Sequence, residues 1–366
     1  MDFELPGRDD PGRLRVRRWL DEHPNATGRE LAEAGYVAPH WPAPYGLDAD
    51  PIEQHVIDDE LRRAGVRRPV NPIGIGWAGP TILHAGSPAQ QERYLRPMLA
   101  GAEIWCQLFS EPEAGSDLAG LRTRAERDGD EYVVNGQKIW TSLAHLAQFG
   151  ILLARTDPDA ERHRGISYFI CPMDAPGIEV RPIVDMTGVH AFNEVFLTDV
   201  RLPVDLLVGE EHHGWELARV TLANERVSLS TGGPLWGNGP TAFELFDVVR
   251  KQGPVTDAVA RGRLATLWTE ARLLDLIGQR TLTASIKGAP PGPEASVRKL
   301  MADVHGQHVM GLAVDLLGAA GMIGSDEWSY GFAFSPALTI GGGTAEVQRN
   351  IIAERVLGLP REQPPN

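Results

Sequence analysis

The pattern of hydrophobic residues changes character twice along this chain, and that change limits the possible folds most strongly. Residues 1–105 contain segments typical of helices, separated by clusters of Pro and Gly. Residues 106–210 contain short β-prone runs separated by turn residues, and helical spacing returns from Gly214 onward. We therefore expect an α+β multi-domain protein, with an N-terminal helical domain (1–105), a middle β-barrel or sandwich domain (106–210) and a C-terminal helical bundle (211–366).

Local patterns predict individual elements within these domains. The turn dipeptides Asp128-Gly129 and Asn135-Gly136 predict a hairpin with Tyr132–Val134 and Gln137–Ser142 as strands. Two helical stripes are expected to face inward in the bundle, and the Pro-rich segment 289–293 separates them. The expected helices are Pro11–Trp19, Gly28–Ala34, Pro51–Gly65 and Ala89–Leu99, the further strands are Ile151–Ala154, Ile166–Ile170, Ile178–Ile183 and Glu194–Leu197, and the stripes are Leu264/Leu267/Trp268/Ala271 and Val297/Leu300/Met301/Val304.

Composition excludes several classes of protein. No run approaches the ~20 apolar residues that a membrane span requires, and the acidic start MDFELPGRDD is unlike a signal or transit peptide. The formal charge of −14 disfavours nucleic-acid partners, because the electrostatic term of binding would be repulsive. Only two cysteines are present, Cys106 and Cys171, and we interpret them as buried apolar residues of a cytoplasmic protein rather than reactive thiols.

Three segments carry the chemistry. They are QLFSEPEAGSD (Gln107–Asp117), NGQKIWTS (Asn135–Ser142) and IGGGTAEVQRNIIAERVLGLP (Ile340–Pro360). In this order and at these separations they resemble the flavin-dependent acyl-CoA dehydrogenase family, and the resemblance extends from Trp41 to the end of the chain. It implies that family's fold, with a C-terminal four-helix bundle, FAD as cofactor, an acyl-CoA substrate and an electron-transfer flavoprotein as electron acceptor.

A flavin site needs hydrogen-bonding groups along the ring edge, donors for the pyrophosphate and a surface to cover the ring. The residues before the Pro-Glu-Ala-Gly-Ser turn can supply free backbone groups, and Trp140 can cover one ring face, although a tryptophan on a strand is more often a core residue. Ser142 retains the hydroxyl of the Thr that is commoner in the family. The resemblance implies flavin contacts from Gln107, Phe109, Ser110, Trp140, Ser142, Thr344 and Glu346, phosphate or acyl-CoA contacts from Gly115 and Ser116, and further substrate contacts from Arg226 and Gly343.

One expected part of the FAD site is altered. Family members carry an Arg-x-x-Phe-Gly element in the bundle that reaches the pyrophosphate of a neighbouring subunit's FAD. Here the stretch 248–262 is shortened and lacks Phe-Gly, which leaves Arg250 or Lys251 as substitutes. Asp315 and Ala319 replace a glutamine and a glycine, and an aspartate would repel a pyrophosphate. Two interpretations remain open: a subfamily with different adenine-end contacts in a homo-oligomer, or a heterotetramer completed by a homologous subunit.

The catalytic base is also displaced. Gly342 occupies the tail position where most relatives carry a glutamate, so that it can offer only a backbone N–H to the thioester carbonyl. Enzymes resembling isovaleryl- and long-chain acyl-CoA dehydrogenases carry the base on an earlier helix instead, and Glu225 matches that position, although an isolated glutamate there would be interpreted as a surface residue. We expect Glu225 to be the base, and the space freed at Gly342 to admit a branched or bulky acyl group. The rivals are a non-catalytic subunit of a heteromer and a flavin oxidase.

The histidines do not form a metal site in this interpretation. His212-His213 and the pair His305 and His308 lack a third ligand at suitable spacing. We expect them to be ordinary surface or core residues.

Overall fold

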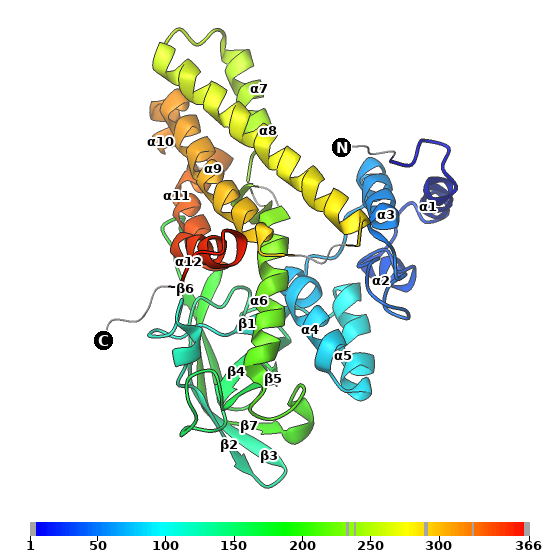
Figure 1. The fold of residues 1–366 in the computed structure, drawn as a ribbon, viewed down its shortest axis with the longest axis vertical. Coiled ribbons are helices and arrows are strands. Elements are labelled where there is room, and N and C mark those ends of the chain that lie inside the picture. Colours follow the sequence, from blue (N-terminus) through cyan, green and yellow to red (C-terminus); the bar gives the residue numbers. More distant parts are fainter. Residues whose placement is uncertain (1–4, 232–233, 238, 289–291, 324–325, 362–366) are drawn as a thin grey trace. The chain divides into compact units, whose positions relative to one another are not determined.

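The computed structural model describes residues 5–231, 234–237, 239–288, 292–323 and 326–361 (Figure 1). It divides into two compact units, one holding the chain up to Asn224 apart from Met186–Gly188, and the other consisting mainly of Glu225 onward. Helix α6 (Gly214–Thr231) contains the boundary between them. None of the described helices is long and apolar enough to cross a membrane.

The N-terminal helices of the first unit begin where their capping residues predict. Asp10 and Asp50 each accept hydrogen bonds from backbone N–H groups and precede a proline at the first helical position. Thr27 and Ser87 form capping boxes with a glutamate and a glutamine three residues later. The helices are α1 (Pro11–Glu22), α2 (Gly28–Glu33), α3 (Pro51–Arg63), α4 (Gly79–Ala85) and α5 (Pro88–Ala100); all but α4, which was not predicted, lie close to the predicted bounds.

A seven-stranded sheet follows, in the order β1-β4-β2-β3-β7-β6, with β5 paired to β4. Side chains alternate along its central strands between two hydrophobic clusters: Ile151 and Tyr168 join the core shared with the helices, and Leu152 and Phe169 join the second core. Cys106 and Cys171 are free and buried in the second core, as the sequence predicted. The strands are β1 (Trp105–Leu108), β2 (Arg124–Asp128), β3 (Glu131–Lys138), β4 (Phe149–Arg155), β5 (Ile166–Pro172), β6 (Ile178–Ile183) and β7 (Phe192–Pro203).

The predicted hairpin at Asn135-Gly136 is wrong. Strand β3 runs straight through these residues, and the hairpin is formed instead by β2 and β3 around Asp128-Gly129. The register between β3 and β7 shifts at Asn135, which marks a β-bulge. Glycine is required next to it because a Cβ at Gly136 would lie 2.3 Å from the hydroxyl oxygen of Thr123. The dipeptide therefore marks a bulge and a close approach rather than a turn.

The second unit is helical, which confirms the predicted order of a helical, a β and a helical part. Helix α9 buries a different face from the predicted stripe: Val297 and Val304 are half-exposed, whereas Lys299 and Asp303 are buried. Residues 289–291 of the predicted Pro-rich breaker lie outside the described residues. The remaining helices are α7 (Ala242–Gln252), α8 (Ala258–Ile286), α9 (Glu294–Leu317), α10 (Ala319–Ile323), α11 (Glu327–Phe334) and α12 (Ala345–Ile351).

Gly177, just before β6, provides a test of the sheet. Its φ is +94°, and an added Cβ would lie 2.1 Å from the carbonyl oxygen of Thr198. Gly129 also has positive φ (+64°), but a Cβ there would meet nothing within 4 Å. We expect Gly129→Ala to lower the free energy of unfolding by about 1–2 kcal/mol through backbone strain, and Gly177→Ala to lower it at least twice as much. Urea denaturation measures both, and equal losses would contradict the close approach of Gly177 to Thr198.

Candidate functional site

A buried ion pair holds the first two motif segments together. The ammonium of Lys138, fully buried, lies 2.8 Å from Oε1 of Glu111 and donates to the carbonyl of Phe109 at 3.1 Å. Ile139 adds a backbone bond to the carbonyl of Ser110 at 2.9 Å. Glu111 in turn accepts the backbone N–H groups of residues 122 and 123. QLFSEPEAGSD and NGQKIWTS are therefore fixed side by side.

The two charges of this pair oppose the effect of burial. Burial alone would raise the pKa of Glu111, but the Lys138 ammonium and the hydrogen bonds that Glu111 accepts hold that pKa below its ordinary value. Burial lowers the pKa of Lys138, and Glu111 opposes that shift. Each group thus depends on the other to remain charged.

The segment after β3 has an unusual backbone. Trp140 and Leu143 both have positive φ, +59° and +60°, which is uncommon for residues other than glycine. The Trp140 side chain is 58% exposed, although tryptophan is usually well buried. Local strain combined with an exposed aromatic ring is typical of a ligand-binding segment. Trp140 is therefore not the core residue that an isolated strand tryptophan would be.

Unsatisfied polar atoms lie beside this segment. Thr141 and Asn193 are joined by two backbone hydrogen bonds, and both side chains are buried. The hydroxyl of Thr141 and Oδ1 of Asn193 have no hydrogen-bond partner. Because buried polar atoms are normally paired, these two atoms fit a site that a polar group completes. Donors and acceptors of this kind suit the polar edges of a flavin.

The other residues of the first unit that were predicted to contact the flavin or the substrate differ in their exposure. Gln107 and Ser110 are half-exposed, and Gly115 and Ser116 are exposed. A Cβ added to Gly115 would meet nothing within 4 Å, so this backbone is open to a ligand. Phe109 differs: its ring is buried and packs edge-on against Tyr168, which leaves only its backbone for a cofactor.

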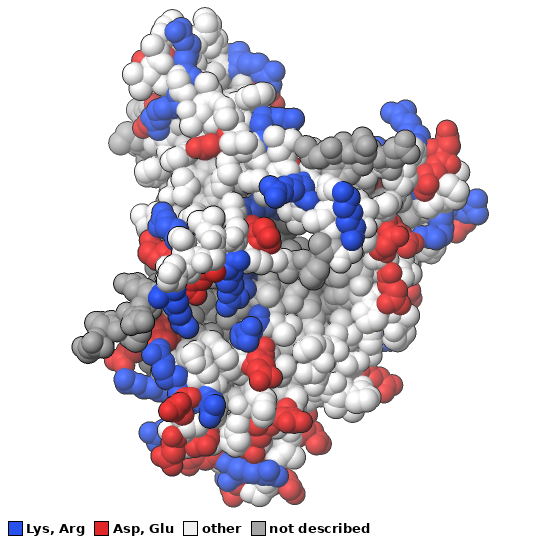
Figure 2. Space-filling model, viewed as in Figure 1, with Lys and Arg blue, Asp and Glu red and all other residues white. Residues whose placement is uncertain are grey.

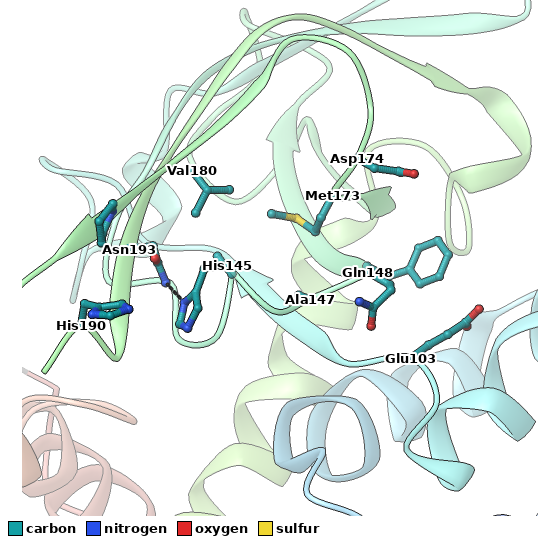
Figure 3. Close-up of a pocket in the computed structure, with 12 residues that line it drawn as sticks. Glu103, His145, Ala147, Gln148, Met173, Asp174, Val180, His190 and Asn193 are labelled. Carbon is teal, nitrogen blue, oxygen red and sulfur yellow. Dashed lines mark hydrogen bonds between the residues drawn. The ribbon is translucent and has the colours of Figure 1, made fainter.

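A cavity of about 720 Å³ adjoins the same segment (Figure 3). Asn193 donates to Nδ1 of His145 at 3.2 Å when that nitrogen is the acceptor, and the His190 ring lies 5.3 Å from that of His145. Glu103 and Asp174 add carboxylates at the cavity lining. On the face of the protein in Figure 2, acidic and basic side chains are intermingled.

The third motif forms a tight glycine loop in the second unit. Gly342 and Gly343 have φ values of +66° and +89°. Gln348, fully buried in α12, donates to the carbonyls of both glycines at 3.1 Å. A Cβ at Gly341 would lie 2.6 Å from the ring of Trp236, and one at Gly343 would lie 2.6 Å from Nε2 of Gln348. Each glycine is therefore required by its surroundings, and the loop has one well-defined shape.

Glu225 lies beside this loop. It is 6% exposed, and its Oε1 is 3.6 Å from the position that a Cβ of Gly342 would occupy. Leu229, one turn further along α6, would be only 2.4 Å from that Cβ. The predicted base, Glu225, and the predicted backbone donor, Gly342, are thus brought together. The space at Gly342 is not open, however, because the Leu229 side chain fills it. The expectation that the missing side chain leaves room for a bulky acyl group is wrong at this point.

The remaining predicted residues of the second unit lie around the loop. Thr344 caps α12 by accepting the backbone N–H of Val347, and Glu346 is exposed in the first turn. Arg226 is half-buried; burial lowers its pKa, and the adjacent Glu225 opposes that shift. Thr344 therefore has a structural role that is compatible with a second contact to a ligand.

The altered adenine-end residues are paired within the chain. Arg263 of α8 lies 2.5 Å from Oδ2 of Asp315 in α9, and Arg250 pairs with Asp247. His305 and His308 both face Glu270, at 2.8 and 3.2 Å. Among the described residues, no three potential ligands form a metal-binding group.

Sequence reasoning missed four charged residues at these sites: Glu111, Lys138, Lys299 and Asp303. Lys299, fully buried, lies 2.6 Å from Asp303, and burial raises the pKa of Asp303 to about 6 although Lys299 opposes the shift. A signal was present in the composition. The chain has 35 basic residues but only four lysines, and two of these lysines are the buried ones. The other two lysines, Lys251 and Lys287, are exposed, so this signal is not specific for a buried ammonium.

Comparison with known proteins identifies the family. Models of the acyl-CoA dehydrogenase N-terminal, middle and C-terminal domains match residues 11–102, 106–200 and 212–357. The chain is 46% identical over 331 residues to acyl-CoA dehydrogenase FadE34 of Mycobacterium tuberculosis. The match covers 90% of this chain but only 46% of that relative, so that the chain spans about half of the relative's length.

Two solved structures are similar over nearly the whole chain. One is described as the Tcur3481-Tcur3483 steroid ACAD, with a TM-score of 0.82 at 30% identity, covering 99% of this chain and 100% of that one. The other is the ChsE4-ChsE5 complex from Mycobacterium tuberculosis, with a TM-score of 0.81 at 31% identity and the same coverage.

The ion pair between the first two motifs yields a direct prediction. Lys138→Met leaves the Glu111 carboxylate buried without its counter-ion, so we expect the free energy of unfolding to fall by about 3–5 kcal/mol. The control is Arg162→Met, which removes an exposed ion pair with Asp117 from the same unit and should cost less than about 1 kcal/mol. Urea denaturation at pH 7 measures both, and similar losses would refute the role given to Lys138.

Proposed function

The chain belongs to the acyl-CoA dehydrogenase family, and from this premise we propose that it introduces a Cα–Cβ double bond into an acyl-CoA thioester, with FAD as cofactor and Glu225 as the base. The observation that carries the proposal is the pairing of a buried glutamate on α6 with a glycine at 342, where Oε1 of Glu225 lies 3.6 Å from the site of a Gly342 Cβ. A carboxylate on the helix thereby takes the place of a carboxylate in the loop.

Each residue has one task in this reaction. Glu225 removes the α-proton, which is acidic enough only when the thioester carbonyl is polarised. The Gly342 N–H is held in a fixed loop and donates to that carbonyl, stabilising the developing enolate charge. FAD, when bound, supplies the hydride acceptor for Cβ. Trp140, Ser142 and the unsatisfied atoms of Thr141 and Asn193 support binding of its ring.

The burial of Glu225 suits this task. A carboxyl group in apolar surroundings is a stronger base than one in water, because the charged form is less well solvated. At 6% exposure, the Glu225 side chain is also restricted in the positions that it can adopt. A base that is held in place near its substrate contributes through orientation as well as through basicity.

The acyl group is proposed to be bulky, of the steroid or branched class. The support is the steroid ACAD among the similar structures, and not a gap at Gly342, which Leu229 fills. An electron-transfer flavoprotein is proposed as the acceptor by family resemblance. The oxidase alternative, with oxygen as acceptor, is distinguished by whether the reduced flavin re-oxidises rapidly in air.

The assembly is proposed to be a heterotetramer with a homologous subunit. The ChsE4-ChsE5 complex is one supporting precedent. The long helix α8 is another source of support, because only Ala260, Leu267 and Ala271 of it are buried while Trp268 is 54% exposed. Purification of the chain alone and with candidate homologues tests this: a colourless protein that becomes yellow only in the complex supports the heteromer, and a yellow, active chain alone contradicts it. A flavin-loaded complex that no acyl-CoA bleaches would favour the non-catalytic alternative.

The base assignment is tested by Glu225→Gln. We expect the rate of flavin bleaching by acyl-CoA under nitrogen to fall by about 10²–10⁴-fold, because the amide cannot accept the α-proton. Flavin content, measured by absorbance, should not change. Glu216→Gln on the exposed side of α6 is the control and should bleach at the wild-type rate. Adding Gly342→Glu to Glu225→Gln should not restore activity, since Leu229 blocks the new side chain. Wild-type bleaching by Glu225→Gln would refute the assignment, whereas restoration by Gly342→Glu would refute only the blocking by Leu229.

Substrate class is tested with a panel of acyl-CoA thioesters. Straight-chain C6–C10 esters, a short branched ester and a steroid side-chain ester are compared by kcat/KM. We expect the bulky esters to exceed the straight chains by at least about tenfold, a difference in transition-state binding of roughly 1.4 kcal/mol. A straight-chain ester that exceeds all bulky ones would contradict the proposed class.

A further inference from the structure

A second buried lysine lies against the proposed base. Lys299 of α9 is fully buried, and its ammonium has two partners, Oδ2 of Asp303 at 2.6 Å and the carbonyl of Leu338 at 3.3 Å. Leu338 belongs to the short helix 335–339 that leads directly into the glycine loop. The ammonium therefore fixes the chain immediately before the loop.

The stem of the same side chain lies beside the loop itself. A Cβ on Gly342 would lie 3.0 Å from Cε of Lys299 and 3.6 Å from Oε1 of Glu225. Lys299, Gly342 and Glu225 thus converge on one point, from α9, the loop and α6. This is the point at which the proposed reaction needs a carboxylate and a backbone N–H in a fixed relation to each other.

We propose that Lys299 is a positioning residue for this reaction. Its ammonium, anchored by Asp303, binds the Leu338 carbonyl and so keeps the Gly342 N–H in a fixed position relative to the Glu225 carboxylate. This inference rests on the proposed function, since it needs Glu225 to be the base. It goes beyond that function by naming the residues that set the base and the N–H donor relative to one another.

An ammonium performs this task better than an apolar side chain would. A methionine could fill the same volume beside Gly342, but it has no donor for the Leu338 carbonyl, and it would leave Asp303 buried without its partner. The ammonium also places a positive charge in the same buried region as the Glu225 carboxylate. The half-buried Arg226, which follows Glu225 on α6, contributes a second positive charge.

Lys299 would have a merely structural role if it only stabilised the fold. The pair of Glu270 and His305 provides a matched comparison, because it links α8 to α9 through a largely buried polar contact of 2.8 Å. The hydrogen bonds of Glu270 go to His305 and His308, on α9 and away from the glycine loop. Glu270→Gln should therefore lower stability without affecting the loop or the chemistry.

The first measurement needs neither cofactor nor substrate. Amide hydrogen exchange of a peptide covering residues 339–345 is compared among wild type, Lys299→Met, Asp303→Asn and Glu270→Gln. The amide of Gly341, bonded to the Ala337 carbonyl at 2.9 Å, reports on the loop. We expect exchange to accelerate by at least about tenfold in Lys299→Met, corresponding to about 1.4 kcal/mol of local opening, and less in Asp303→Asn. Exchange of this peptide in Glu270→Gln should match wild type.

The second measurement is the anaerobic bleaching rate per bound flavin, with the acyl-CoA that bleaches the wild type fastest. Normalising to bound flavin removes any loss of folded protein. For Lys299→Met we expect kcat to fall about 100-fold, as a displacement of the reacting groups predicts, while KM changes less than about threefold, because binding of the CoA ester is unaffected. In Asp303→Asn, which keeps the Lys299 ammonium and the shape of the side chain at 303, we expect kcat to fall about tenfold. This variant provides the test if Lys299→Met does not fold.

The outcomes separate the two proposals. If Glu225→Gln stops bleaching but Lys299→Met and Asp303→Asn bleach at the wild-type rate, the positioning role is refuted and the base assignment stands. If Glu225→Gln bleaches normally, the proposed base is wrong and the positioning role falls with it. Faster loop exchange with unchanged kcat would also overturn the inference, because it would make Lys299 structural only.

Discussion

The buried ion pair between Lys138 and Glu111 is the interaction on which the first half of the site depends. Removing two charges from water costs several kcal/mol each, and a hydrophobic pair of equal volume would often be at least as stable. The pair therefore contributes more to position than to stability. It joins the strand that ends at Lys138 to the turn that begins at Ser110, and it leaves Trp140 at the surface with a strained backbone. Lys299 and Asp303 repeat this arrangement beside the glycine loop.

The position of the base follows from packing in the second unit. A carboxylate can act on the same carbon from a loop or from a helix, provided that one of them leaves room for the other. Here the loop has no side chain at 342, and its Cβ position is occupied by Leu229, with Lys299 and Glu225 close behind. A Cβ at 342 would lie 2.4 Å from the end of the Leu229 side chain, so that a glutamate in the loop would require Leu229 to move. Gly342 is therefore compatible with the proposed base on α6, and it is not evidence of a larger pocket.

The sequence predicted the elements whose signals are local. The four predicted helix starts of residues 1–105 lie within one residue of the observed ones, because caps such as Thr27 and Ser87 act on the backbone next to them. The three motifs gave the family, which matching domain models confirm. The Asn135-Gly136 dipeptide was wrongly predicted as a turn, because a glycine that is required by its close approach to Thr123 gives the same sequence signal as a turn glycine. The buried face of α9 was missed because Lys299 and Asp303 have the residue types of a solvent-exposed face, and only their tertiary pairing permits burial.

The ion pairs of Asp315 and Arg250 bear on whether the FAD site requires a homologous second subunit. An unpaired aspartate at 315 would repel a pyrophosphate, but Arg263 lies 2.5 Å from Asp315 and largely neutralises it at close range. Both side chains are exposed, so that solvent and salt weaken the effect of either charge further. Asp315 therefore does not by itself argue against a dinucleotide in a homo-oligomer. Arg250, the proposed substitute for the missing arginine, is paired with Asp247 and would have to break that contact to reach a phosphate. The case for a homologous partner consequently rests on the missing Arg-x-x-Phe-Gly element and on the ChsE4-ChsE5 precedent, because the exposed apolar residues of α8 would suit a homo-oligomer equally.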